Sequence, residues 1–239
     1  MPALISTSRE RVLDAFAHRQ PDRVPLDLGA TAVTGIHVSV VAALRRHFGL
    51  ERRPVKVHEP FQMLGLVDED LKQALGVDID GVFRRKTMFG FENRDWKPWH
   101  FNGLEVLVPG QFNTITGDNG DTLIFPEGDT SAPPSGRMPR GFHFFDAIIR
   151  QNHFDEDRLD PRDNLEEFGS LTDAEIAGIA EDVKAARAGG RAVIANLGGT
   201  ALGDIALVPA PWLRDPRGIR DVTEWYVSLR SRQSGARQR

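Results

Sequence analysis

Apolar residues recur at helical spacing in four stretches of the chain, and two of these stretches begin with a capping box. Thr7 and Glu10 precede the first, and Thr172 and Glu175 precede the last. A capping-box hydroxyl and carboxylate satisfy the first free N–H groups of a helix, so each pair predicts a helix start. The first helix must end before Pro21, because the residue ahead of a proline avoids the helical region. Apolar spacing alone predicts the other two helices, over residues 38–48 and 67–75.

Short apolar runs lie between the predicted helices and are typical of buried strands. They cover residues 24–28, 77–83, 192–197 and 205–208. Continuous apolar strands that alternate with helices favour a parallel sheet covered by helices. Residues 89–125 interrupt this order with aromatic, β-branched and turn residues. Asn119 and Gly120 separate two alternating segments there, which predicts an antiparallel hairpin with both turn residues at positive φ.

Composition places the chain among globular proteins and excludes several classes. Hydrophobic residues make up 40% and charged residues 27% of its 239 positions. The chain has no cysteine, which excludes disulfides, thiolate catalysis and cysteine-ligated zinc within it. A net charge of −4 provides no basic field for nucleic acid. No apolar run approaches the roughly 18 residues of a membrane span. With no secretory signal visible, we expect a cytoplasmic protein without a membrane partner, and a disordered basic tail over residues 229–239.

Residues 8–29, SRERVLDAFAHRQPDRVPLDLG, resemble the opening of the uroporphyrinogen decarboxylase superfamily. Members of that superfamily begin with a helix, a Gln-Pro-Asp-Arg-(Val/Ile)-Pro turn and a first barrel strand. Later blocks resemble it in the same order: VKVHEPFQMLGLVDEDLKQALGVDIDGV, DNGDTLIFPEGDTSAPPSGRMPRGFHFFDAIIR and VIANLGGTALGDIALVPAPWL. The resemblance covers residues 8–226 and implies a (β/α)8 TIM barrel. A closed barrel of this kind needs eight strands, and the sequence shows three or four. We therefore expect one incomplete barrel domain over residues 1–239, with a hairpin insertion around 89–125. We also expect the chain to correspond to only the N-terminal part of the longer members of the superfamily.

The resemblance implies two activities, which differ in the residues they require. One is zinc-dependent methyl transfer between methylated corrinoids and thiols, and the other is cofactor-free decarboxylation of uroporphyrinogen III in haem biosynthesis. Decarboxylases carry Met-Arg-Gln-Ala-Gly-Arg after the first strand and Phe-Ser-Asp at the end of the second. This chain has LGATAVTGIH and Phe83-Arg84-Arg85 in those places. We expect a corrinoid-dependent, methyltransferase-like enzyme, with decarboxylation as the alternative. The third hypothesis is that the chain is not an enzyme but a truncated or split half-barrel.

Candidate substrate-binding residues follow the predicted strands. Asp27 lies near the carboxyl end of the first strand, and barrel enzymes have their active sites at that end of the strands. The alternative for Asp27 is a carboxylate satisfied by amides of the next loop. Asn196 and the Gly198–Gly199 pair follow a later strand, and the glycines let backbone amides approach an anionic ligand. The alternative for these glycines is a tight turn packed on the next helix. We expect all four residues to position substrate, and no catalytic residue is assigned.

Basic and histidine side chains complete the candidate set. Arg84 and Arg85 follow the second strand and can bind carboxylates or phosphates, or belong to a solvated loop. His58 lies in a family-like block and either faces the barrel mouth or packs in the core. The seven histidines show no metal-binding spacing, so we expect no metal site in this chain. Zinc and a corrinoid remain possible if a second half supplies ligands. The expected partners are a small molecule (a porphyrinogen, a methylated compound or a corrinoid protein) and a second chain or copy that completes the barrel.

Overall fold

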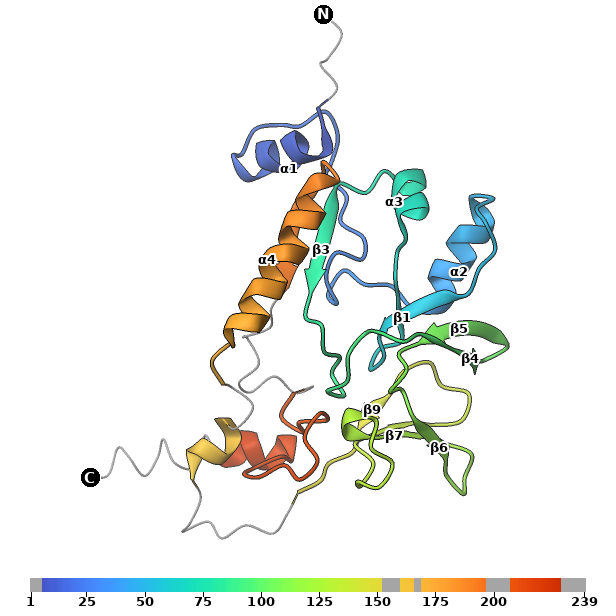
Figure 1. Ribbon diagram of the computed structural model, residues 1–239, viewed down its shortest axis with the longest axis vertical. Helices are drawn as coiled ribbons and strands as arrows, with labels where there is room; N and C mark the ends of the chain where they lie inside the picture. Colours follow the sequence, from blue (N-terminus) through green and yellow to red (C-terminus); the bar gives the residue numbers. More distant parts are fainter. Residues whose placement is uncertain (1–5, 152–159, 166–168, 197–206, 229–239) are drawn as a thin grey trace, which may run out of the picture. The chain divides into compact units, whose positions relative to one another are not determined.

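A computed structural model describes residues 6–151, 160–165, 169–196 and 207–228. The chain divides into two compact units (Figure 1). Unit 1 comprises Met1–Arg85, Asn93–Pro109 and Leu171–Leu197, and unit 2 comprises Lys86–Glu92, Gly110–Ser170 and Gly198–Arg239. In the described part of the chain, no helix combines the length and the apolar character that crossing a bilayer requires.

The four predicted helices are confirmed, and all belong to unit 1. Both capping boxes form: Thr7 and Glu10 start one helix, and Thr172 and Glu175 start another. Each hydroxyl accepts the N–H of its glutamate, and each glutamate carboxylate accepts the N–H of its threonine. The helices are α1 (Ser8–Phe16), α2 (Val38–His47), α3 (Glu69–Leu75) and α4 (Asp173–Ala188).

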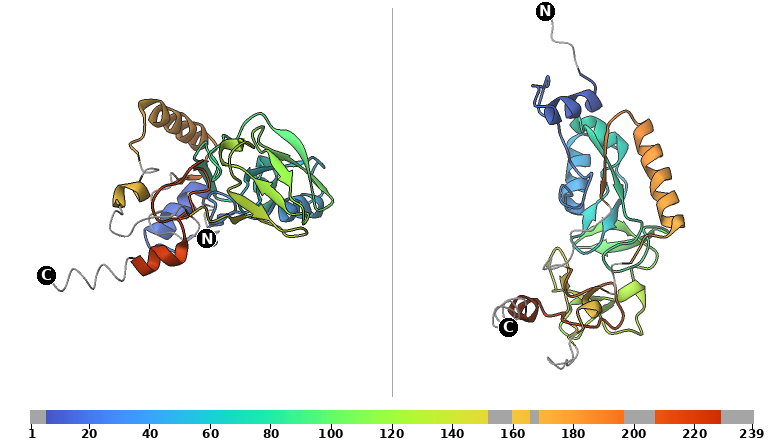
Figure 2. Two further views of the ribbon diagram at one scale, coloured as in Figure 1. Left: turned by 90° about the horizontal axis from the view of Figure 1, so that it is seen from below. Right: turned by 90° about the vertical axis from the view of Figure 1, so that its left-hand side faces the viewer.

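Unit 1 contains a pair of parallel strands, and this part of it comes closest to the predicted parallel sheet. β3 (Ile79–Phe83) and β10 (Ala192–Asn196) pair in parallel over five residues each, from Ile79 opposite Ala192 to Phe83 opposite Asn196. α4 leads almost directly into β10 and packs along the pair (Figures 1 and 2). The prediction that this apolar run is fully buried is wrong, because the side chain of Ile194 is 38% exposed.

Unit 1 also contains a mixed sheet. Its antiparallel pair over residues 97–108 lies within the antiparallel segment predicted at 89–125, whereas the strands at 55–59 and 64–65 were not predicted. Its strand order is β2-β1-β5-β4, with β1 and β5 parallel and the other neighbours antiparallel. α2 packs against β1 and β2. The alternating Val55 and Val57 are buried in this sheet, and β1 carries His58. The strands are β1 (Val55–Glu59), β2 (Leu64–Gly65), β4 (Lys97–Phe101) and β5 (Leu104–Val108).

The expected TIM barrel is wrong. The described strands form three small sheets, one mixed, one parallel and one antiparallel, and none of them closes. Residues 24–28, the expected first barrel strand, are not a strand. The Leu26 N–H donates to the Asp78 carboxylate, and the Leu26 carbonyl accepts the Asp78 N–H. Pro25 has no N–H to offer a neighbouring strand. Of the expected strand at 205–208, Leu207 and Val208 lie in a turn, and the other two residues lie outside the described ranges.

Unit 2 is built around an antiparallel sheet and a cluster of aromatic rings. The strands β6 (Thr114–Thr116), β7 (Thr122–Ile124), β8 (Gly136–Met138) and β9 (Asp146–Ala147) pair in chain order. The rings of four buried phenylalanines meet at centroid distances between 5.8 and 6.4 Å: Phe89, Phe91, Phe112 and Phe145.

The predicted β6–β7 hairpin is confirmed, but its turn differs from the prediction. Gly120 has φ = 84°, whereas Asn119 does not adopt positive φ. The Gly120 N–H donates to the Gly117 carbonyl, and the Gly117 N–H donates to the Asp121 carbonyl. This arrangement is a longer loop that needs one left-handed residue instead of two. The predicted disordered tail, residues 229–239, lies outside the described residues.

Candidate functional site

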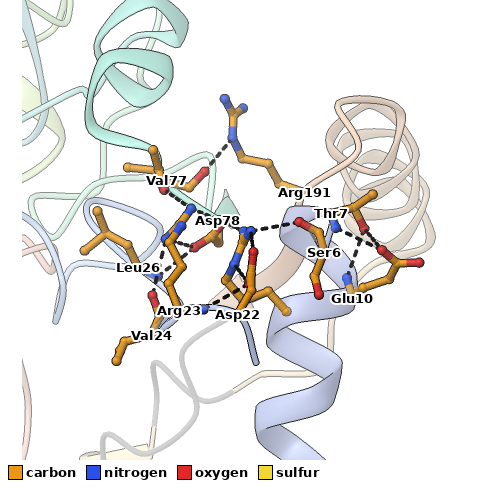
Figure 3. Close-up of polar contacts among 12 residues, drawn as sticks. Ser6, Thr7, Glu10, Asp22, Arg23, Val24, Leu26, Val77, Asp78 and Arg191 are labelled. Atoms are coloured by element: carbon orange, nitrogen blue, oxygen red, sulfur yellow. Dashed lines mark hydrogen bonds and ion pairs between the residues drawn. The ribbon is translucent and has the colours of Figure 1, made fainter. Parts of the chain in front are cut away.

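The Pro-Asp-Arg turn that suggested the family resemblance binds to Asp78, the residue directly before β3, through a buried ionic cluster (Figure 3). Asp78 is fully buried, and its carboxylate accepts from Arg11 Nη1 at 2.6 Å and from Arg23 Nη1 at 2.7 Å. Arg11 also donates from Nε to Asp22 at 2.6 Å. Asp22 and Arg23 therefore hold α1 and the following turn against β3, which is a structural role.

The protonation states in this cluster follow from its hydrogen bonds. Burial on its own would raise the pKa of Asp78, but bonds from the Leu26 N–H and the Ser8 side chain, together with the two arginines, outweigh it, so the pKa of Asp78 lies below its usual value. The bond from Arg11 lowers the pKa of Asp22 to about 2. Both carboxylates are thus ionised at neutral pH, and the cluster offers no proton for chemistry.

Asp27, the first candidate residue, stabilises the loop that follows it. Its Oδ1 accepts the Ala30 N–H at 3.2 Å and the Thr34 hydroxyl at 3.1 Å. The same loop lies very close to β3: a Cβ added to Gly81 would be 1.9 Å from the Ala30 carbonyl oxygen. These contacts match the loop-satisfying alternative for Asp27, and the sequence alone could not distinguish it from a ligand-binding role.

Three other candidates meet at the carboxyl ends of β3 and β10. Asn196 lies opposite Phe83 in the parallel register, and the exposed Arg84 and Arg85 follow Phe83 directly. Arg85 is tied to α4, because it donates to the Asp182 carboxylate and, from Nη2, to the Gly178 carbonyl at 3.3 Å. Arg84 therefore remains the more accessible cation at this end. Gly198 and Gly199 lie outside the described residues.

His58 lies at the same end of β3 and is the most unusual polar side chain of unit 1. The residue is 8% exposed, and its ring centroid is 4.8 Å from that of Phe83. Nε2 is buried and has no hydrogen-bond partner. Burial lowers the pKa of His58 to about 4, so the imidazole is neutral at physiological pH. A buried polar atom without a partner is costly, and such atoms often mark functional sites.

Asn93 is the second such side chain, and it contacts His58 directly. Its Nδ2 donates to the His58 carbonyl at 2.8 Å, which fixes the orientation of the amide. Its Oδ1 is buried and has no partner. Asn93 was not predicted from the sequence, because a single asparagine in an irregular loop carries no periodic or motif signal. We call these two residues the His58–Asn93 pair.

The carboxylate of the neighbouring Glu59 bonds to backbone N–H groups of its own turn. Its two carboxylate oxygens accept the N–H groups of Phe61 at 3.0 Å and Gln62 at 2.8 Å, closing the turn between β1 and β2. Burial raises the pKa of Glu59, and these two bonds oppose the rise. The two buried atoms without a partner, His58 Nε2 and Asn93 Oδ1, both belong to uncharged groups.

The residues do not match a metal centre. Within the described ranges, no group of three or more histidine, aspartate or glutamate side chains is arranged to hold a metal ion. Cysteine is absent from the sequence. A zinc site of the kind that the family resemblance implies would need three or four such ligands.

Comparisons with other proteins neither support nor contradict the family resemblance. No family model, no curated protein and no solved structure matches the chain significantly.

Proposed function

We propose that this chain is an enzyme that holds a small organic molecule at the carboxyl end of β3, and that its reaction belongs to the corrinoid-dependent methyl-transfer class. The reaction class rests on the sequence blocks that resemble the uroporphyrinogen decarboxylase superfamily. The location rests on one observation, the buried Nε2 of His58 that lacks a hydrogen-bond partner.

The position of His58 supports a binding site. In open parallel sheets, ligands bind outside the carboxyl ends of the strands. Phe83 is the last residue of β3, and the His58 ring contacts it. A ligand group that hydrogen-bonds to Nε2 would remove the cost of leaving that nitrogen unsatisfied, about 1–3 kcal/mol.

The side chains at this site are suited to binding and orienting a ligand. An imidazole with a pKa near 4 is a weak base at pH 7, so His58 would position the ligand through a hydrogen bond. Phe83 offers an apolar surface, and Arg84 offers an exposed positive charge. A corrinoid would supply the methyl group, and these side chains would hold it in place.

Equilibrium dialysis of the full chain against methylcobalamin tests this proposal. We expect saturable binding, and we expect His58→Leu to weaken it about tenfold, the effect of losing one buried hydrogen bond. The exposed His100 provides the control, and His100→Leu should bind like the parent chain.

A parallel titration with uroporphyrinogen III separates the two activities that the resemblance implies. Preferential binding of uroporphyrinogen would replace methyl transfer by decarboxylation. No binding of either compound, or equal binding by both histidine variants, would contradict a ligand site at His58.

A further inference from the structure

The His58–Asn93 pair presents a defined set of unused hydrogen-bonding atoms. Asn93 Nδ2 is occupied by the His58 carbonyl, so the free atom of this amide is the acceptor Oδ1. The other free atom is Nε2 of a neutral imidazole, which either donates or accepts according to its tautomer. A group that satisfies both atoms must donate to Asn93, and it must also donate to or accept from His58.

The charges around the pair restrict this group further. Glu59 lies next to His58, and its carboxylate bonds to backbone N–H groups. Arg85 is bonded to Asp182 and Gly178 on α4. The pair itself is uncharged. Arg84, which follows Phe83, is exposed to solvent. An ionised ligand group bonded to the buried atoms of the pair itself would lose its hydration there, which is unfavourable.

We propose that the His58–Asn93 pair is a subsite for an uncharged carboxamide group of the ligand. A carboxamide N–H donates to Asn93 Oδ1, and its carbonyl or second N–H meets His58 Nε2. A carboxylate has the same shape but offers acceptors alone, so it leaves Asn93 Oδ1 unsatisfied. The Phe83 ring beside His58 suits a planar group.

This inference deepens the proposed function and rests on it, because it assigns the chemistry that the ligand presents at the same site. Carboxamide side chains surround a corrinoid ring, whereas carboxylates surround uroporphyrinogen. A subsite that selects amides over carboxylates therefore favours the corrinoid of the two.

The test is an NMR titration of the full chain with acetamide and with acetate, which share one shape. The signals observed are the imidazole nitrogens of His58, assigned by their loss in His58→Phe. We expect acetamide to shift Nε2 saturably and acetate to leave it unchanged. An equal response to acetate overturns the proposal, and so does the absence of any response to acetamide, which would leave water as the occupant. Isopropanol, which donates and accepts without being planar, should bind more weakly, and tighter binding of isopropanol overturns the carboxamide assignment.

A matched pair of variants tests the role of Asn93. Asn113 in unit 2 makes the same kind of bond, from Nδ2 to the Gly128 carbonyl at 2.8 Å, but its Oδ1 is not a buried unpartnered atom. Asn93→Leu should weaken acetamide binding at least tenfold, and Asn113→Leu should not change it. Equal effects overturn the proposal. If Asn93→Leu does not fold, the comparison of acetamide with acetate on the parent chain still decides.

The outcomes separate this inference from the proposed function. Binding of methylcobalamin without a response to acetamide keeps the proposed function and removes the carboxamide subsite. A response to acetamide without binding of methylcobalamin keeps the subsite and removes the corrinoid.

Discussion

At the scale of single residues, Asp78 has the largest structural role in unit 1. Its carboxylate accepts two hydrogen bonds from Arg23, one from Arg11 and one from the Leu26 N–H, and the Ser8 side chain is a further donor. Arg11 is itself 5% exposed. A buried charge of this kind is tolerated because its partners surround it, and removing one partner leaves an uncompensated charge in the core.

Asp78→Asn should therefore destabilise the fold by about 3–5 kcal/mol, the usual cost of breaking a buried ion pair from one side. Urea unfolding monitored by circular dichroism measures this change. Asp14→Asn is the control, because Asp14 pairs with an Arg19 side chain that is 66% exposed. Exposed pairs contribute about 0–1 kcal/mol. Similar losses in the two variants would show that Asp78 is not the central anchor.

At the scale of elements, the close approach of the Asp27 loop to β3 restricts the sequence at Gly81. Gly81→Ala would place a methyl group 1.9 Å from the Ala30 carbonyl oxygen, and a backbone atom cannot move aside as a flexible side chain does. We expect a loss of about 3 kcal/mol, at the upper end for overpacking. Thermal unfolding measures it.

Gly169→Ala is the matched control for Gly81→Ala, since nothing lies within 4 Å of a Cβ at Gly169. This variant should unfold within about 0.5 kcal/mol of the parent chain. If Gly81→Ala is as stable as Gly169→Ala, the loop does not pack on β3 in solution.

The capping box of α4 permits a second prediction at this scale. Thr172→Ala removes the hydroxyl that accepts the Glu175 N–H, and it should lower stability by about 1 kcal/mol. The exposed Thr130 lies outside any helix, and Thr130→Ala should have no such effect. Unfolding curves in urea compare the two, and equal changes would contradict a role for the cap.

The same elements show what the sequence could and could not predict. Helix caps and hairpin glycines act over three or four residues, so α1, α4 and the β6–β7 hairpin were predictable. Residues 24–28 were read as a strand because they are apolar, but the Leu26 N–H donates to the Asp78 side chain instead of to a neighbouring strand. That contact joins residues 52 positions apart, and no local pattern encodes it.

The residues of the candidate site also differ in whether the sequence could predict them. His58 and Asn196 were identified from their blocks, and Asn93 was missed. Asn93 has a role because it donates to a carbonyl 35 residues away, a relation that depends on the fold rather than on spacing. The barrel prediction failed because the resemblance of sequence blocks was extended to a whole topology.

At the scale of the whole molecule, several groups make stability depend on pH in the same direction. The pKa of Glu69 is lowered to about 2, chiefly by its bond from Arg191, and the pKa of Asp22 is lowered to about 2 by Arg11. Burial lowers the pKa of His58 to about 4 from 6.5. A group whose pKa is lower in the folded chain adds stability above its unfolded pKa and loses it as the pH falls. Glu59, whose pKa is raised, acts in the opposite direction.

We expect stability to fall between pH 6.5 and 4, with His58 contributing about 3 kcal/mol across this window. Unfolding free energies at a series of pH values measure the slope. The slope reports how many protons the chain binds on unfolding. His58→Phe should lower that number by up to one, and His100→Phe should leave it unchanged. A slope that His58→Phe does not alter would mean that His58 is not buried in its neutral form.

The Asp78 cluster also has a consequence for how the chain opens. α1, the Pro-Asp-Arg turn and Leu26 all bond to the Asp78 carboxylate, so these segments share one point of attachment beside the bonds from Arg9 to the Arg187 and Arg191 carbonyls. They should detach together, as one cooperative unit, before the β3–β10 pair separates. Amide hydrogen exchange would then give residues 8–26 a common opening free energy, lower than that of β3.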